Sequence, residues 1–317
     1  MTRLGCAVLA ICLSVASASE AAPGSSHGCA GLRYTCAELV QFGFTYPFLR
    51  EAGSYLFVNG VAYPYAEMTG RLLDDSAVRM PDSTTMRVRD LLAAYGLATE
   101  GGKELVPVLG YGSNASPDQL VRKFVATDFP GSAVIPVMKG RLKDYDIAWS
   151  PLFVAYGAMP ATIIPSPGTE VEVWVTWLNR AAVERMDASE GSGGLYASGI
   201  LRDAQLELDG PRPREVRVYV SCYGALRVNG AILALAAVPA TGRTSRPVDA
   251  ATAIRAVFPA LHWQGSVFDL LLENVTSEPV RNDHTKKIQG LGVKLPDPNF
   301  ASEHPCGASP GAGGGAF

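Results

Sequence analysis

The sequence feature that most constrains the fold is a buried strand that turns through two glycines into a helix. The apolar run Leu-Val-Pro-Val-Leu at residues 105–109 predicts the strand. Gly110 and Gly112 follow, and Ser116-Pro117 is typical of a helix start with proline at the first helical position. Such a turn directs backbone N–H groups at one point, which can hold a carboxylate or a developing oxyanion. The loop is therefore a candidate binding element, although most glycine pairs in such positions are plain turns.

A second stretch places one carboxylate in a glycine-rich turn. Residues 180–188 predict a helix, and the sequence Met-Asp-Ala-Ser-Glu-Gly at 186–191 ends it. Glu190 is thereby a candidate acid or base, whereas Asp187 is more typical of a helix-end polar group than of a second acid. Taken alone, Glu190 is also more typical of a solvated residue after a helix.

Together the two stretches resemble the gamma-glutamylcyclotransferase family, whose signatures are a YGSN loop and a single catalytic glutamate. Residues 111–114 match the loop, Glu190 matches the glutamate, and Tyr196 resembles the family tyrosine that follows it. The order of segments is similar over residues 105–275. The strand at 171–178 lacks the central glycine of the family pattern, which is a departure.

The resemblance implies a fold, an activity and a site. The order of elements fits an α+β domain with a curled mixed sheet, and the family implies a small mixed β-barrel flanked by helices. The implied enzyme releases 5-oxoproline and a free amine from a small-molecule gamma-glutamyl amine or peptide, without cofactor or metal. Glu190 would be the general acid and base. The implied substrate-binding residues are Tyr111, Gly112, Ser113, Asn114 and Tyr196.

Other interpretations of the same residues stay open. A non-catalytic ligand-binding domain of the same fold would keep the pocket and lose turnover. Residues 110–115 also fit the dinucleotide fingerprint G-x-G-x-x-A, but Pro117 starts the helix too late and Lys139 and Arg141 stand where an acidic residue is expected. Residues 24–28 fit the serine-hydrolase pattern G-x-S-x-G by chance, because no strand precedes them. Tyr111 can serve simply as a buried ring that anchors the loop.

Composition narrows the class of protein. The 317 residues are 48% hydrophobic with a net charge of −3, which suits one globular domain with additions. No basic block favours nucleic acid, and no run of 18 apolar residues predicts a membrane span. The sequence does not indicate an oligomeric state or the identity of the leaving amine.

The N-terminus has the shape of a signal peptide. Arg3 precedes an apolar stretch, and Ala16-Ser17-Ala18 is a possible cleavage site. We therefore expect residues 1–18 to be removed and the protein to be secreted or periplasmic, with a cytoplasmic protein as the alternative. Four cysteines would remain and allow three pairings, of which a local Cys29–Cys36 bridge is preferred, while free thiols stay possible. They are Cys29, Cys36, Cys222 and Cys306.

The chain divides into four predicted parts. Residues 19–104 form a flexible lead-in and an extension of unknown role, residues 105–275 form the cyclotransferase-like domain, and residues 276–317 form a polar, glycine-rich tail expected to be disordered. Within the extension, Asn59-Gly60 predicts a β-hairpin and residues 86–95 a helix. Leaving-group specificity is expected from residues 30–104 and the strand loops. The domain's predicted strands are 105–110, 132–138, 145–149, 171–178, 196–208 and 215–222, and its helices are 117–125, 180–188, 248–258 and 266–275.

Overall fold

The computed structural model describes residues 34–97, 105–126, 129–191 and 194–307. The predicted leader, Cys29 of the preferred Cys29–Cys36 bridge, and the glycine-rich end at 308–317 lie outside these ranges. The described part is α+β, as predicted: it holds eight α-helices and sixteen strands joined in one mostly antiparallel sheet. None of the described helices is long and apolar enough to cross a membrane.

The sheet is built around two long antiparallel strands, β6 (Val134–Trp149) and β7 (Ala161–Leu178). The predicted strands 132–138 and 145–149 are parts of the single strand β6. Asp144 takes a positive φ of 64° and shifts the register without ending the strand. The Asp144 carboxylate accepts a hydrogen bond from the backbone N–H of Gly168 in β7. A bulge therefore bends β6 where the sequence indicated a break.

The remaining strands extend this pair on both sides. The main path runs β16-β8-β10-β5-β7-β6-β1-β2-β3-β4, with β9, β11–β15 as branches, and is larger than the small barrel that the resemblance implied. The strands on the path are β1 (Tyr55–Val58), β2 (Val61–Glu67), β3 (Ala77–Arg79), β4 (Thr85–Arg87), β5 (Val106–Gly110), β8 (Tyr196–Arg202), β10 (Glu215–Ser221) and β16 (Phe300–His304). The branches are β9 (Leu206–Leu208), β11 (Ala225–Val228), β12 (Ala231–Leu235), β13 (Ala240–Thr241), β14 (Arg246–Val248) and β15 (Gly292–Val293).

The extension belongs to the same sheet. The predicted hairpin forms β1 and β2, and Asn59 and Gly60 both take the positive φ that a two-residue turn of this kind requires. β1 then pairs antiparallel with β6. The predicted helix of residues 86–95 is the shorter α2 (Val88–Ala94), because Met86 and Arg87 lie in β4.

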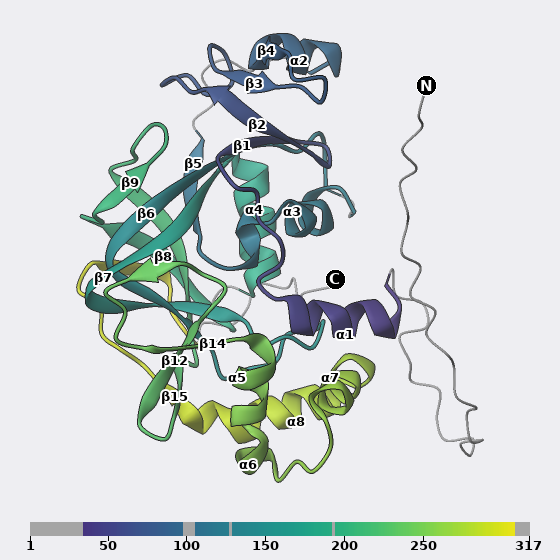
Figure 1. Cartoon of the computed structure of the whole chain (residues 1–317), viewed down its shortest axis with the longest axis vertical. Coiled ribbons are helices and arrows are strands. Elements are labelled where there is room, and N and C mark those ends of the chain that lie inside the picture. The colour runs from purple at the N-terminus through teal and green to yellow at the C-terminus, as the bar shows by residue number, and fades with distance from the viewer. Residues whose placement is uncertain (1–33, 98–104, 127–128, 192–193, 308–317) are drawn as a thin grey trace, which may run out of the picture.

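Helices occupy three regions around the sheet, and α2 lies in one of them beside β3 and β4 (Figure 1). α3 (Pro117–Phe124) and α4 (Arg180–Glu190) lie side by side along one flank, while α1 (Cys36–Thr45), α5 (Ala250–Ala256), α6 (Phe258–Leu261), α7 (Val267–Thr276) and α8 (Glu278–Ile288) gather at one end. Each group covers its own hydrophobic core: α3 and α4 pack on Trp174 and Tyr219, and the end helices pack on Trp149 and Leu235. Local signals start the helices, such as the capping boxes Thr35–Glu38 of α1 and Ser266–Asp269 of α7.

The predicted disorder of residues 276–317 is wrong for residues 278–304. This segment forms α8, the 3-10 turn η2 (Gln289–Leu291), β15 and β16. Its polar composition is misleading because only one side of α8 packs, through His284, Thr285 and Ile288, while β16 is fixed by pairing with β8. Backbone pairing and a few buried side chains can order a segment that has too little apolar surface for a core of its own.

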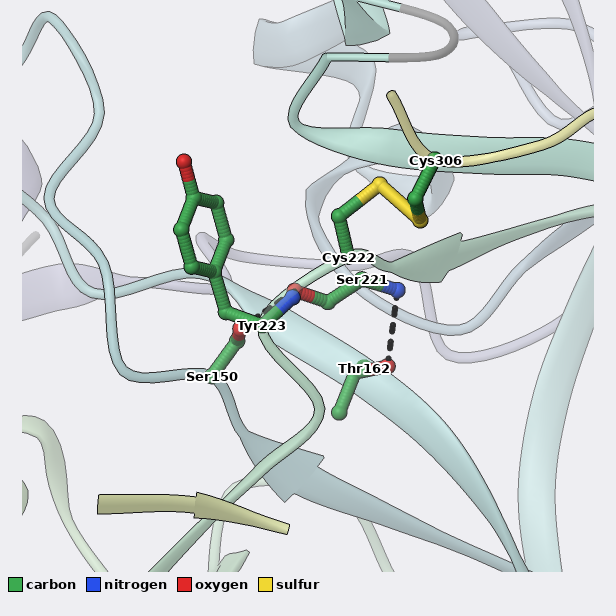
Figure 2. Close-up of a disulfide and its surroundings, with 6 residues drawn as sticks. All are labelled: Ser150, Thr162, Ser221, Cys222, Tyr223 and Cys306. Atoms are coloured by element: carbon green, nitrogen blue, oxygen red, sulfur yellow. Dashed lines mark hydrogen bonds between the residues drawn. A yellow bond between two sulfur atoms is a disulfide. The ribbon is translucent and has the colours of Figure 1, made fainter. Parts of the chain in front are cut away.

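A disulfide between Cys222 and Cys306 fixes the end of β16 to the turn after β10 (Figure 2). The neighbouring Ser221 is itself held, since its backbone N–H donates to Thr162 and its hydroxyl lies 2.6 Å from that of Ser150. The bond therefore ties the C-terminal segment to the buried middle of the sheet.

Removing this bond should destabilise the fold. The bridge spans a sequence separation of 84 residues, and closing a loop of this size typically stabilises a protein by about 2–4 kcal/mol. We expect the double variant Cys222→Ser, Cys306→Ser to lose a free energy of unfolding in this range by urea titration. Ser302→Ala, an exposed change on the same strand, is the matched control. Identical unfolding curves for the double variant and the wild type would contradict the structural role of the bridge.

Candidate active site

The predicted strand, loop and helix form as expected and present the loop at a cavity. β5 buries Val108 and Leu109, residues 113–115 form the 3-10 turn η1, and α3 begins at Pro117. The Tyr111 ring is buried and its hydroxyl donates to the backbone carbonyl of Tyr219 in β10. Tyr111 thus anchors the loop to the sheet while also lining the cavity.

Position 112 must be glycine because the hydroxyl group of Tyr46 lies where a side chain would begin. A Cβ at this position would lie 2.6 Å from the hydroxyl oxygen of Tyr46, which follows α1. That hydroxyl also accepts the backbone N–H of Ala161 at 2.9 Å, so it cannot move away without losing a buried hydrogen bond. The second glycine of the motif therefore makes room for Tyr46, a residue for which the sequence carries no signal.

The two motifs meet at Glu190. α4 ends at this residue because Gly191 takes the left-handed conformation, with φ 59° and ψ 49°. The Oε1 atom of Glu190 accepts a hydrogen bond from Nδ2 of Asn114 at 3.0 Å. Residues separated by 76 positions in the chain are thereby joined at the edge of one cavity.

All six predicted site residues line this cavity, which has a volume of about 220 Å³. The loop supplies four of them, Glu190 comes from the end of α4, and Tyr196 begins β8. The Tyr196 hydroxyl donates to the carbonyl of Ala161 at 2.8 Å and is buried. The structure therefore brings the six predicted residues together at one cavity, and their roles stay predictions.

A buried lysine completes the carboxylate's surroundings and was not predicted. Lys123 of α3 has 2% of its side chain exposed, and its Nζ donates to Oε1 of Glu190. The same Nζ lies 3.2 Å from Sδ of Met186. A sequence signal exists: Lys123 follows Leu120 by three residues and adjoins Phe124, so it lies on the apolar face of the helix, where an unpaired lysine is rarely tolerated.

Aromatic side chains form much of the remaining wall. Phe153 and Tyr156 lie on the loop between β6 and β7, and Tyr46 follows α1. Burial raises the pKa of every tyrosine that lines the cavity, so their hydroxyls stay protonated near neutral pH and donate hydrogen bonds rather than accept protons. These tyrosines are Tyr46, Tyr111, Tyr156, Tyr196 and Tyr219.

The C-terminal segment supplies part of the rim. Glu278, Arg281 and Asn282 of α8 line the cavity. Arg281 donates from Nη1 to the backbone carbonyl of Asn274 at 2.8 Å, and burial lowers its pKa. Within the described part of the extension, Tyr46 lines the cavity, and the expected role of residues 30–104 in leaving-group specificity stays a prediction.

Asp187 has a structural role, as the sequence suggested. Its carboxylate accepts the Tyr219 hydroxyl at 2.6 Å and two nitrogens of Arg217. Arg217 also contacts Glu303 of β16. This network fixes α4 against β10 and the C-terminal strand, one turn before Glu190.

The cavity combines a carboxylate with a buried ammonium group and neutral hydrogen-bond donors. Its lining includes two carboxylates, Glu190 and Glu278, but neither cysteine nor histidine among the described residues. Nor do the described ranges contain three His, Cys, Asp or Glu side chains grouped so that they could hold a metal ion. The arrangement can move a proton and donate hydrogen bonds.

The dinucleotide interpretation of the loop does not fit the topology. β5 pairs with β7 and β10, and the strand that follows α3, β6, lies beyond β7 in the sheet. The strand–helix–strand unit of a dinucleotide fold needs two parallel strands that lie next to each other in the sheet, whereas β7 separates β5 from β6. The serine-hydrolase pattern at residues 24–28 lies outside the described residues.

Comparisons with known proteins give only partial structural likeness. No protein-family model and no curated protein matches the chain. Similar solved structures include a gamma-glutamyl cyclotransferase, 21% identical over 37% of this chain and 67% of that one, with a TM-score of 0.28. Another is an uncharacterized protein from Homo sapiens, 15% identical over 61% of this chain and 95% of that one, also with a TM-score of 0.28. The functional argument therefore rests on the cavity itself.

The fit between Gly112 and Tyr46 can be tested by substitution. Gly112→Ala should force the loop or the Tyr46 ring to shift, at a cost typical of overpacking, about 1–3 kcal/mol in the free energy of unfolding. The cost should be smaller in a Tyr46→Phe background, which lacks the oxygen that the new methyl group would meet. Gly70→Ala, where a Cβ has open space, is the control. Equal costs in both backgrounds would show that the hydroxyl does not require the glycine.

Proposed function

We propose that the protein is a gamma-glutamylcyclotransferase-like enzyme that converts a gamma-glutamyl amine or peptide into 5-oxoproline and a free amine. The contact between Asn114 and Glu190 carries the proposal, because it unites the loop and the carboxylate of the resemblance at one cavity. The small size of the cavity suits a gamma-glutamyl group with its leaving amine near the opening.

The proposed reaction needs no protein nucleophile. The substrate's own α-amine attacks its γ-carbonyl carbon, a new C–N bond closes a five-membered ring, and the original amide C–N bond breaks. The attacking nitrogen loses a proton, and the leaving nitrogen gains one. Holding the substrate in the attacking shape makes the step intramolecular, which can correspond to effective molarities of about 10⁵ M or more.

Glu190 is the group proposed to move the proton. As a carboxylate it takes the proton from the attacking amine, and as a carboxylic acid it returns it to the leaving amine. The buried tyrosines cannot share this role, because burial raises their pKa values and keeps their hydroxyls protonated. They remain able to donate hydrogen bonds to the substrate.

The loop is proposed to hold the charges of the substrate. Backbone N–H groups of Gly112, Ser113 and Asn114 would receive the α-carboxylate or the developing oxyanion, as the resemblance implies. Tyr196 also lines the cavity, and it is proposed to help exclude water from the substrate. If the predicted leader directs export, the substrates would be extracellular gamma-glutamyl peptides or a secreted metabolite carrying a gamma-glutamyl group.

Substitution of Glu190 tests the proposed role. Glu190→Gln keeps size and hydrogen bonding but cannot take up a proton, so release of 5-oxoproline from a panel of gamma-glutamyl amides should fall by about 10²–10⁴-fold. Substrate binding, measured by calorimetry, should largely survive. Glu184→Gln is the matched control, because Glu184 is an exposed residue of the same helix that pairs with Arg180.

Two results would contradict the proposal. Turnover by Glu190→Gln at the wild-type rate would remove Glu190 from the mechanism. A wild-type protein that binds gamma-glutamyl compounds and never releases 5-oxoproline would instead be a ligand-binding domain of the same fold.

A further inference from the structure

Lys123 lies where it can control the orientation of the proposed base. Its buried side chain runs from α3 to α4, where Nζ contacts Met186 and Glu190. An ammonium group buried to this degree is tolerated when it is paired with an opposite charge. Glu190 supplies that charge through Oε1.

Both donors to Glu190 bind the same oxygen. Nζ of Lys123 and Nδ2 of Asn114 each donate to Oε1. The second oxygen, Oε2, accepts no hydrogen bond from any residue in the described ranges. Because Glu190 lines the cavity, Oε2 is the oxygen left to meet a substrate.

The lysine is fixed at its backbone as well as at its tip. Nε of Arg185, which precedes Glu190 on α4, donates to the backbone carbonyl of Lys123 at 3.1 Å. Since α3 starts directly after the loop, Lys123 makes the loop and the carboxylate one rigid unit. A glutamate without these contacts would sample several rotamers, and only some of them would direct Oε2 at the substrate.

We propose that Lys123 is a positioning residue that holds Oε1 of Glu190 and thereby presents Oε2 to the substrate's amine. This inference rests on the proposed function. Lys123 does not touch the reacting atoms; it acts through the carboxylate, and Asn114 supports it from the loop.

The charges around the pair are consistent with this role. Burial lowers the pKa of the Lys123 ammonium, while the Glu190 carboxylate acts in the opposite direction and Arg185 adds to the lowering. The tyrosines that face Glu190 are neutral, and the other charged groups at the cavity are Glu278 and Arg281 on α8. Among the described residues, Glu190 is the carboxylate that forms an ion pair with Lys123.

The test compares variants that separate charge from packing. Lys123→Met keeps an apolar stem of similar length but loses the ammonium. We expect its kcat for 5-oxoproline release to fall about 10-fold or more, as part of the 10²–10⁴-fold effect of general-base catalysis, with KM little changed. Lys123→Arg keeps a charged donor and should recover part of kcat. Lys139→Met, which removes a lysine paired with Glu172 away from the cavity, should match the wild type.

The possible outcomes distinguish the inference from the proposed function. An active wild type together with Lys123→Met at unchanged kcat overturns the inference and leaves the function standing. A wild type that is inactive on every gamma-glutamyl amide overturns both. A raised KM at unchanged kcat would show that the lysine serves substrate binding and also overturns the inference. Should Lys123→Met fail to fold by circular dichroism, Lys123→Arg and Lys123→Gln decide: kcat in the order Lys, Arg, Gln supports the inference, and equal values overturn it.

Discussion

The candidate site depends on an ion pair between two helices that are distant in the chain. Lys123 is almost fully buried, and such a charge needs a partner, which Glu190 provides across the contact between α3 and α4. The pair fixes the end of α4 relative to the loop that precedes α3, and Asn114 adds a second link from the loop itself. Removing either partner would leave the other charge poorly compensated. The ion pair therefore stabilises the fold in addition to fixing the proposed base.

Segments on both sides of residues 105–275 contribute to the lining of the cavity. Tyr46, directly after α1, occupies the space left by Gly112, and α8 brings Glu278, Arg281 and Asn282 to the rim. The C-terminal strand is held by the Cys222–Cys306 bridge and contacts Arg217, which in turn holds Asp187 on α4. The helix that carries Glu190 is thus supported from the far end of the chain.

Much of the local structure could be predicted from the sequence. The hairpin at Asn59-Gly60, the strand–loop–helix at residues 106–124 and the helix before Glu190 have short-range signals, namely turn glycines, caps and apolar periodicity. The six predicted site residues could be named in advance because the resemblance assigns them to two short segments, residues 111–114 and 190–196. The order of elements was enough to place both motifs in one α+β domain.

The rest depends on long-range contacts that a single sequence does not display. Lys123 and Glu190 are 67 positions apart, and only the position of the lysine on an apolar helix face hints at a buried partner. α8 and β16 are too polar to predict a core, since the first packs along one side and the second is held by pairing and a disulfide. In the sequence, Asp144 looks like the end of a strand. The hydrogen bond that stabilises the bulge there comes from Gly168 on the neighbouring strand, which the local sequence does not reveal.

In the proposed reaction, the substrate's own amine displaces the leaving group without water. The most direct measurement is turnover of a gamma-glutamyl amide in water enriched in oxygen-18, followed by mass spectrometry of the products. The account predicts unlabelled 5-oxoproline and one equivalent of free amine. Glutamate carrying oxygen-18 would contradict it, because that product requires hydrolysis of the amide by water.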